Sequence, residues 1–229
     1  MNPASRHLGL MIALTFVTGL VDAGGYLGLD RVFVGNMTGN VVILGMGAAG
    51  ADGLPVLGPA LALATFIFGA GIAGLSMRSS PAGWSPRLSA VVVGSVLLVA
   101  ATAILIGFAS SDDVKVVAAA MTAFAMGMQA AAARKVGVAD VTTVVVTSTI
   151  TVWAVDMFAR PSRATILNRR IAAIVAILLG ALVGALLVEI ALWLVFAVAA
   201  VLGGVVAVVG HGTMLAEGRL AKSGPEARS

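Results

Sequence analysis

The sequence predicts an all-α membrane protein that crosses the bilayer several times, and three observations lead to this prediction. Apolar residues make up 60% of the 229 residues, whereas charged residues make up only 10%. Soluble domains carry about 25% charged residues and do not hide this much apolar surface in one core. The apolar residues also form runs that approach the ~20 residues needed to span a bilayer as a helix.

This composition argues against an ordinary soluble enzyme, a disordered tail and a nucleic-acid-binding domain. The net charge is +4, but the basic residues stand between apolar runs, as in loops that fix membrane topology. The chain has no cysteine, which removes disulfides, thiol catalysis and cysteine metal sites. Neither an HExxH helix, a Walker A loop nor a GxSxG elbow is present. We therefore expect no enzyme activity, no cofactor, no bound metal and no nucleic-acid partner.

Eight apolar segments follow one another within a single membrane domain, residues 1–229. Turn-forming residues at 51–55 and 79–83 separate some of them, and serines at 110–111 offer N-caps for the fifth. Six segments approach spanning length, whereas the second and sixth are shorter and richer in Thr, Ser, Asn and Gly. The segments are roughly 8–29, 36–49, 56–77, 88–108, 114–133, 142–158, 171–188 and 191–210.

The two ends of the chain carry further expectations. Arg6 precedes an apolar run, as in a signal peptide, but this run is long enough to span and no A-x-A-like cleavage site follows. We therefore expect a retained first helix. The polar residues 217–229 are expected to form a flexible cytoplasmic tail.

Positively charged residues discriminate between two topologies. If all eight segments cross the membrane, nine of the 14 basic residues lie inside. If segments 36–49 and 142–158 enter and leave on one side, twelve of the 14 lie inside and only Arg31 and Lys115 lie outside. Because basic residues concentrate in cytoplasmic loops, we favour six spanning helices plus two re-entrant half-helices, with both termini cytoplasmic. The alternative is eight spanning helices in two parallel repeats.

The favoured topology consists of two inverted repeats, about 8–108 and about 114–210. At an offset of about 107 residues, Asp22 falls on Gln129. The same offset places Asn36 on Thr143, and Asn40 on Thr147. Many secondary transporters are built from inverted repeats whose broken helices meet near the membrane midplane.

Asp22 lies well inside a long apolar segment, about fourteen residues and roughly 20 Å from its start. An ionisable group at membrane depth is costly, so it is a candidate functional residue. The alternative is a hydrogen-bonded carboxyl group that only fixes helix packing. Two other acidic residues, Asp156 and Glu189, lie at segment ends, where an ion pair with Arg160 and an interfacial position explain them equally well.

Residues 32–40 are typical of an extended stretch followed by a helix start, which Asn36 or Thr38 would cap. Such backbone at membrane depth is tolerated only beside protein or a water-filled cavity. The N-terminus of a half-helix suits an anionic or carboxylated solute. The alternative is an ordinary loop with a helix cap. In the second repeat the corresponding threonines are Thr142, Thr143 and Thr147.

Glycines in the first and third segments are expected to allow close helix contacts, because small residues are favoured where membrane helices pack. They are Gly24, Gly25, Gly28, Gly69, Gly71 and Gly74.

Two motifs resemble the signatures of the YoaK-like family of bacterial inner-membrane proteins, a domain of unknown function. The first is Gly19-x-x-Asp22-Ala23, then Tyr26-Leu27-x-Leu29, then Phe33-x-x-Asn36-Met37-Thr38-Gly39-Asn40. The second is Met126-Gly127-Met128-Gln129-x-Ala131, followed by Arg134-Lys135-x-Gly137-x-x-Asp140-Val141-Thr142-Thr143. Ala130 stands where this family is expected to carry Asn. The resemblance covers essentially the whole chain and implies a multi-pass protein of the bacterial inner membrane, without assigning a substrate.

These observations predict a small secondary transporter that works by alternating access on a small solute or ion. The half-helix ends favour an anion, and they leave an amino acid or a neutral solute open. Asp22 is the candidate for proton or cation coupling. The alternatives are a passive channel and a structural or partner-binding subunit, and the small chain leaves room for a homo-oligomer. The expected substrate-binding residues are Asp22, Tyr26, Asn36, Thr38, Asn40, Gln129, Thr142, Thr143 and Thr147.

Overall fold

The computed structural model describes residues 3–51, 53–109, 111–137, 146–159 and 169–223. Within these ranges the chain forms eight α-helices and no strand. The helices are α1 (Pro3–Gly28), α2 (Met37–Ala48), α3 (Leu57–Ser76), α4 (Pro86–Phe108), α5 (Asp112–Val136), α6 (Val146–Ala159), α8 (Arg169–Ile190) and α9 (Leu192–Ser223). The all-α fold class is confirmed.

The helices fall into two length classes. Six of the described helices, α1, α3, α4, α5, α8 and α9, are long and apolar enough to cross a membrane. With 12 and 14 residues, α2 and α6 are shorter than the ~20 residues of a spanning helix. Six long and two short apolar segments were predicted from the sequence, and this division is confirmed.

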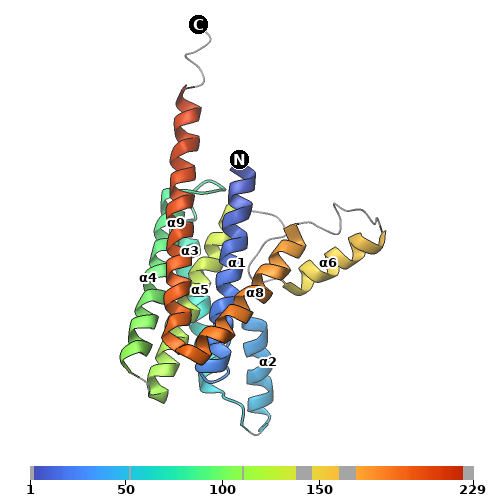
Figure 1. The fold of residues 1–229 in the computed structure, drawn as a ribbon, viewed down its shortest axis with the longest axis vertical. Coiled ribbons are helices and arrows are strands. Elements are labelled where there is room, and N and C mark those ends of the chain that lie inside the picture. The colour runs from blue at the N-terminus through green and yellow to red at the C-terminus, as the bar shows by residue number, and fades with distance from the viewer. Residues whose placement is uncertain (1–2, 52, 110, 138–145, 160–168, 224–229) are drawn as a thin grey trace.

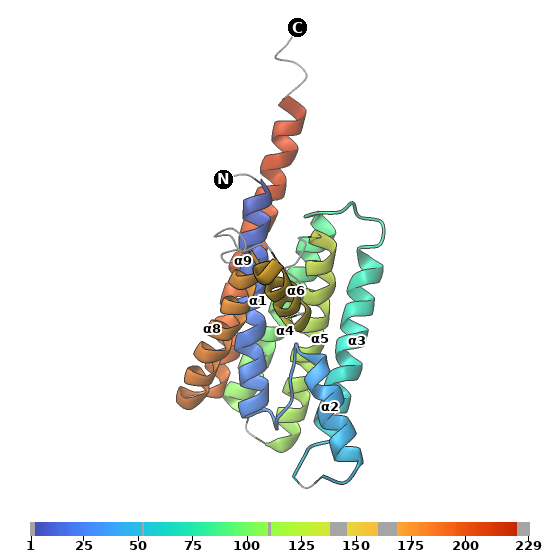
Figure 2. The ribbon, with the colours of Figure 1, turned by 90° about the vertical axis from the view of Figure 1, so that its right-hand side faces the viewer.

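The long helices run side by side in a bundle, with both ends of the chain at the same end of it (Figures 1 and 2). Helix α1 packs against α8 and α9, while α5 packs against α3 and α4, and α4 also contacts α9. Helix α2 lies against α3 at the end of the bundle away from the termini. Helix α6 contacts α8 and projects from the side of the bundle.

Large apolar side chains cover much of the outer surface of the long helices. Phe68, Leu97, Leu178 and Val201 are each more than half exposed. A water-soluble monomer rarely exposes so much contiguous apolar surface, whereas lipid tails solvate it well. The buried core combines small residues such as Ala119 with larger ones such as Phe196.

Four glycines bring the long helices together most closely. They are Gly19 and Gly180 between α1 and α8, and Gly69 and Gly127 between α3 and α5. A Cβ atom at any of the four would collide with a backbone carbonyl oxygen of the partner helix. These positions therefore require glycine because the two backbones touch, as is common where membrane helices cross.

The expectation for the glycines of the third segment is confirmed at Gly69 and wrong at Gly71 and Gly74. A Cβ at either of the latter two would meet open space. In the first segment Gly24 and Gly28 do approach side chains of α9. The positions of glycines in a helix sequence do not reveal which face meets another helix, so the sequence pattern alone overcounts the contacts.

One helix boundary agrees with the expected cap, and another differs from the expected start of the tail. Ser111 caps α5 as predicted, because its side-chain oxygen accepts a hydrogen bond from the Val114 N–H. At the other end of the chain α9 continues to Ser223, so seven residues of the expected tail are helical. Residues 224–229 lie outside the described part of the chain.

Candidate functional site

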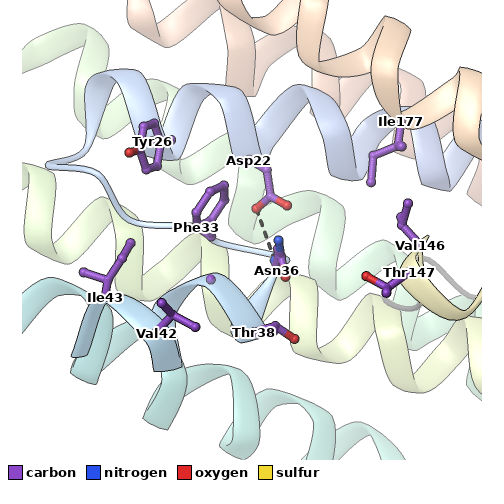
Figure 3. A pocket seen from close by; sticks show the side chains of 11 residues that line it. Asp22, Tyr26, Phe33, Asn36, Thr38, Val42, Ile43, Val146, Thr147 and Ile177 are labelled. Atoms are coloured by element: carbon purple, nitrogen blue, oxygen red, sulfur yellow. Dashed lines mark hydrogen bonds between the residues drawn. The ribbon is translucent and has the colours of Figure 1, made fainter. Parts of the chain in front are cut away.

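The chain reverses direction directly after α1. Asp30 and Arg31 both adopt the left-handed conformation, with φ values of 61° and 58°, which is uncommon for residues other than glycine. The Arg31 guanidinium donates a 3.1 Å hydrogen bond to the carbonyl of Gly53, between α2 and α3. This reversal sends residues 32–36, the returning segment, back along α1 before α2 begins (Figure 3).

Asp22 of α1 holds the returning segment. Its Oδ1 atom accepts hydrogen bonds from the N–H groups of Val34 at 2.9 Å, Gly35 at 2.6 Å and Asn36 at 3.3 Å. Backbone N–H groups just before a helix have no intrahelical acceptor, and lipid offers none. One carboxylate oxygen therefore satisfies three backbone donors that would otherwise be costly to bury.

Two close approaches make glycine necessary beside this carboxylate. A Cβ at Gly35 would press against the Thr18 methyl group and lie next to both carboxylate oxygens of Asp22. A Cβ at Gly39 would overlap the ring of Phe33. Both glycines thus let the returning segment and α2 lie against their neighbours.

Asn40, in the first turn of α2, holds the other side of the returning segment. Its Oδ1 atom accepts the Phe33 N–H at 2.9 Å, and its Nδ2 group donates to the Phe33 carbonyl at 2.6 Å. The Asn40 side chain is fully buried. Its two hydrogen bonds to the Phe33 backbone replace those that a neighbouring strand would make. Asp22 and Asn40 together fix the path of the chain into α2.

A cavity of about 480 Å³ lies between the starts of α2 and α6. Figure 3 shows its lining, which comes from α1, the returning segment, α2, α6 and α8. The lining residues are Asp22, Tyr26, Phe33, Asn36, Thr38, Gly39, Val42, Ile43, Val146, Thr147 and Ile177. Asp22 is the charged side chain among them.

Asp22 presents two different oxygens to its surroundings. Only 8% of the residue surface is exposed, and Oδ1 is occupied by the three backbone donors. Oδ2 accepts no hydrogen bond from any described residue. In Figure 3 this second oxygen points away from Asn36. It is an acceptor available to a molecule in the cavity.

Tyr26 stands between this cavity and a second one of about 580 Å³. Its ring packs on that of Phe33, with the ring centroids 4.9 Å apart. The second cavity lies where α1 ends and α5 begins, and its lining includes Asp30, Arg31 and Lys115. Tyr26 therefore belongs to the lining of both cavities.

Five of the nine residues expected to bind substrate line the first cavity. They are Asp22, Tyr26, Asn36, Thr38 and Thr147. Asn40 lies behind the lining and orders it through Phe33. Thr142 and Thr143 lie outside the described residues.

Gln129 does not reach the cavity lining. It is buried on α5, where its Nε2 group lies 3.4 Å from the Leu14 carbonyl and 3.4 Å from the Thr18 hydroxyl, both on α1. The second of these contacts links Gln129 to the residue that packs beside Gly35. Gln129 thus connects α5 to α1 through Thr18, which packs beside the returning segment.

One expected local interaction is wrong, and a second involves a residue outside the described part of the chain. Asn36 occupies the N-cap position of α2, but neither its side chain nor that of Thr38 caps the helix. Instead, the Asp22 carboxylate on α1 accepts the N–H groups that precede α2. Asp156 forms an ion pair with Arg170 on α8, and its carboxylate is 46% exposed. The expected partner, Arg160, lies outside the described residues.

Sequence reasoning missed the apolar part of the lining. Val42, Ile43, Val146 and Ile177 look like any lipid-facing residue in the sequence, because aliphatic side chains carry no chemical signal. Phe33 was visible as the start of the family motif, but its pairing with Tyr26 was not. Among the described residues no cluster of three or more His, Asp or Glu side chains is suited to a metal ion.

Comparisons with known proteins agree with this architecture. A family model described as "Protein of unknown function (DUF1275)" matches residues 10–209. The UPF0700 transmembrane protein YoaK of Bacillus subtilis (strain 168) is 30% identical over 196 residues, which cover 83% of this chain and 86% of that protein. No solved structure matches the chain. The chain therefore belongs to the DUF1275 family of YoaK-like transmembrane proteins.

Proposed function

We propose that this protein is a small secondary transporter that moves a small solute by alternating access. One observation carries the proposal: the starts of both short helices, α2 and α6, line the same cavity. In many transporters discontinuous helices meet at a substrate site between repeats. Asp22, Tyr26, Asn36, Thr38 and Thr147 would contact the solute.

The proposed topology has α2 and α6 as re-entrant half-helices. Asp22 lies six residues, about 9 Å, from the end of α1, and the returning segment reaches it before α2 runs back to the same end of the bundle. Helix α6 begins at the cavity and runs outward from the side of the bundle, with its far end tilted toward the end that holds both termini. The two short helices thus leave the cavity in different directions, which supports two separate half-helices.

The packing pairs support two inverted repeats, α1–α4 and α5–α9. Exchanging α1 with α5, α2 with α6, α3 with α8 and α4 with α9 turns the α1–α8 contact into the α5–α3 contact. It also turns α1–α9 into α5–α4, and α2–α3 into α6–α8, and it keeps α4–α9. The crossing glycines follow the same exchange, since Gly19 corresponds to Gly127 and Gly69 to Gly180. In this correspondence the α5 residue equivalent to Asp22 is Ala130 rather than the expected Gln129.

The proposed orientation has both termini in the cytoplasm of a bacterial cell, with the protein in the inner membrane. The starts of α1, α4 and α8 and the end of α5 carry Arg6, Arg87, Arg169 and Arg134, and they lie at the end of the bundle that holds the termini. Arg31 and Lys115 lie at the other end. Basic residues favour the cytoplasmic side, which supports this orientation.

Asp22 is the proposed coupling residue, and Asp22→Asn tests it. Asparagine keeps an Oδ1 acceptor for the three backbone donors, so the variant is expected to fold, but its side chain cannot take up a proton or balance a cation. We expect Asp22→Asn to lose solute-driven proton movement in proteoliposomes that hold a trapped pH dye. Amines, amino acids, carboxylates and sugars serve as test solutes.

Asp113→Asn is the matched control, because Asp113 is exposed at the start of α5 and lies outside the cavity. It should behave as the wild type. Coupled transport that is unchanged in Asp22→Asn would remove the coupling role. Flux that never saturates and shows no counterflow would replace the transporter with a channel, and absence of flux together with a co-purifying protein would favour a partner-binding subunit.

A further inference from the structure

Building on the proposed transporter, we infer that its solute carries a protonated amino group, which donates a hydrogen bond to Oδ2 of Asp22. The solute class is a small organic amine with a short apolar body. This inference replaces the anion that helix N-termini alone would favour.

The charge balance of the cavity is the first argument. Its described lining contains one carboxylate, Asp22, and no lysine, arginine or histidine. The other polar groups are the hydroxyls of Tyr26, Thr38 and Thr147 and the amide of Asn36. An anion in this cavity would face a carboxylate without a basic side chain to offset the repulsion, whereas a cation would meet an opposite charge.

The use of the backbone donors is the second argument. The N–H groups of Val34, Gly35 and Asn36, just ahead of α2, all point at Oδ1 of Asp22. An anionic solute at this end of α2 would have to compete with that carboxylate for the same donors. The anion-binding capacity of the returning segment is therefore already taken up within the protein.

The open oxygen is the third argument. Asp22 is nine-tenths buried, and its Oδ2 lacks a donor among the described residues. This oxygen belongs to a residue that lines the cavity, so a molecule there can reach it, and a charged donor forms a stronger bond with a carboxylate than a neutral one does. An ammonium group supplies three N–H donors and the complementary charge.

The remaining lining fits the body of such a molecule. The rings of Tyr26 and Phe33 lie beside the site, and aromatic faces attract cations. Val42, Ile43 and Val146 offer an apolar surface for a short alkyl chain. The volume of about 480 Å³ is within the range of small-molecule sites.

The test compares probes that share one carbon skeleton and differ in charge. n-Butylamine, n-butyrate and n-butanol are titrated at neutral pH into the purified full-length protein in detergent, and binding is followed by calorimetry and by the shift in Tm. A series of primary amines from methylamine to hexylamine covers the unknown chain length. We expect at least one amine to bind saturably and to raise Tm, whereas butyrate and butanol do not.

Two variants assign the binding to this cavity. Asp22→Asn should raise the Kd for the amine at least tenfold, while Asp113→Asn leaves it unchanged. Tyr26→Leu, which keeps apolar bulk and removes the ring, should raise the Kd severalfold and gives a second readout if Asp22→Asn is poorly folded. Binding of butyrate in place of the amines, binding of no amine, or equal amine affinity in wild type and Asp22→Asn would each overturn the inference.

Binding in detergent needs no gradient, so this test is separate from that of transport. Amine binding through Asp22 without saturable counterflow in vesicles would leave the inference standing and remove the transporter. Saturable counterflow of a carboxylate without amine binding would overturn the inference and leave the transporter standing.

Discussion

The two halves of the molecule are alike in how their long helices cross and different in how their short helices are held. Gly19 and Gly180 join α1 to α8 in the same way that Gly127 and Gly69 join α5 to α3. By contrast, α2 is anchored through a buried carboxylate on α1, and the proposed repeat makes Ala130 the α5 residue equivalent to Asp22. The glycine crossings are alike in the described helices, whereas the carboxylate that lines the cavity belongs to α1.

The crossing glycines should give the largest and most equal effects in the two halves. In each of Gly19→Ala and Gly127→Ala the new methyl group overlaps a backbone carbonyl oxygen of the partner helix. We expect each to lower the free energy of unfolding by about 3 kcal/mol, the upper range for overpacking. Unfolding in detergent, followed by circular dichroism, measures this loss.

Gly71→Ala is the control for these substitutions, because a Cβ at Gly71 meets open space. It should be neutral or slightly stabilising, by up to about 1 kcal/mol, since alanine is the better helix former. A large loss in only one of the two crossings would show that the halves are not packed alike.

Replacing Asp22 with alanine should lower the free energy of unfolding more than replacing it with asparagine, which removes only the charge. Asp22→Ala leaves three backbone N–H groups, two of them buried, without an acceptor, and we expect a loss of about 2–3 kcal/mol. Asp22→Asn keeps an acceptor and should lose about 1 kcal/mol or less. Hydrogen exchange of residues 34–36 locates the effect. Equal stability of the two variants would mean that Oδ1 does not hold the returning segment.

Asn40 tests the other side of the same anchor. Asn40→Ala removes both hydrogen bonds to Phe33 in a fully buried position, and we expect a loss of about 1–2 kcal/mol. Asn36→Ala is the matched control in the same segment. Its side chain is exposed and makes no capping bond, so its substitution should change stability by less than about 0.5 kcal/mol.

The ion pair between α6 and α8 should give the smallest effect. The Asp156 carboxylate is 46% exposed, and partly exposed pairs contribute about 0–1 kcal/mol. We expect Asp156→Asn to lower stability by less than about 1 kcal/mol, and 0.5 M salt to reduce the difference from wild type. A loss as large as that of Asp22→Ala would mean that α6 is anchored as firmly as α2.

Much of the fold could be predicted from the sequence, because apolar run lengths report directly on helices in a membrane protein. Asp22 was identifiable for the same reason, since a carboxylate inside a long apolar run is rare. The partner of Asp22 was not identifiable, because three backbone N–H groups leave no trace in the identity of the side chains. The exposed or buried state of Gly71 and Gly74 was equally hidden, since it depends on which helix lies opposite.

The two oxygens of the Asp22 carboxylate share one negative charge. Oδ1 holds the returning segment, whereas Oδ2 is available to a molecule in the cavity. Whatever binds Oδ2, a proton or a cation, draws electron density from Oδ1 and weakens the three bonds that keep the returning segment in place. Linkage is reciprocal, so a shift of α2 that breaks those bonds must change the affinity at Oδ2 by the same factor. Occupancy of the cavity and the position of α2 are thereby parts of a single equilibrium, without any longer chain of contacts between them.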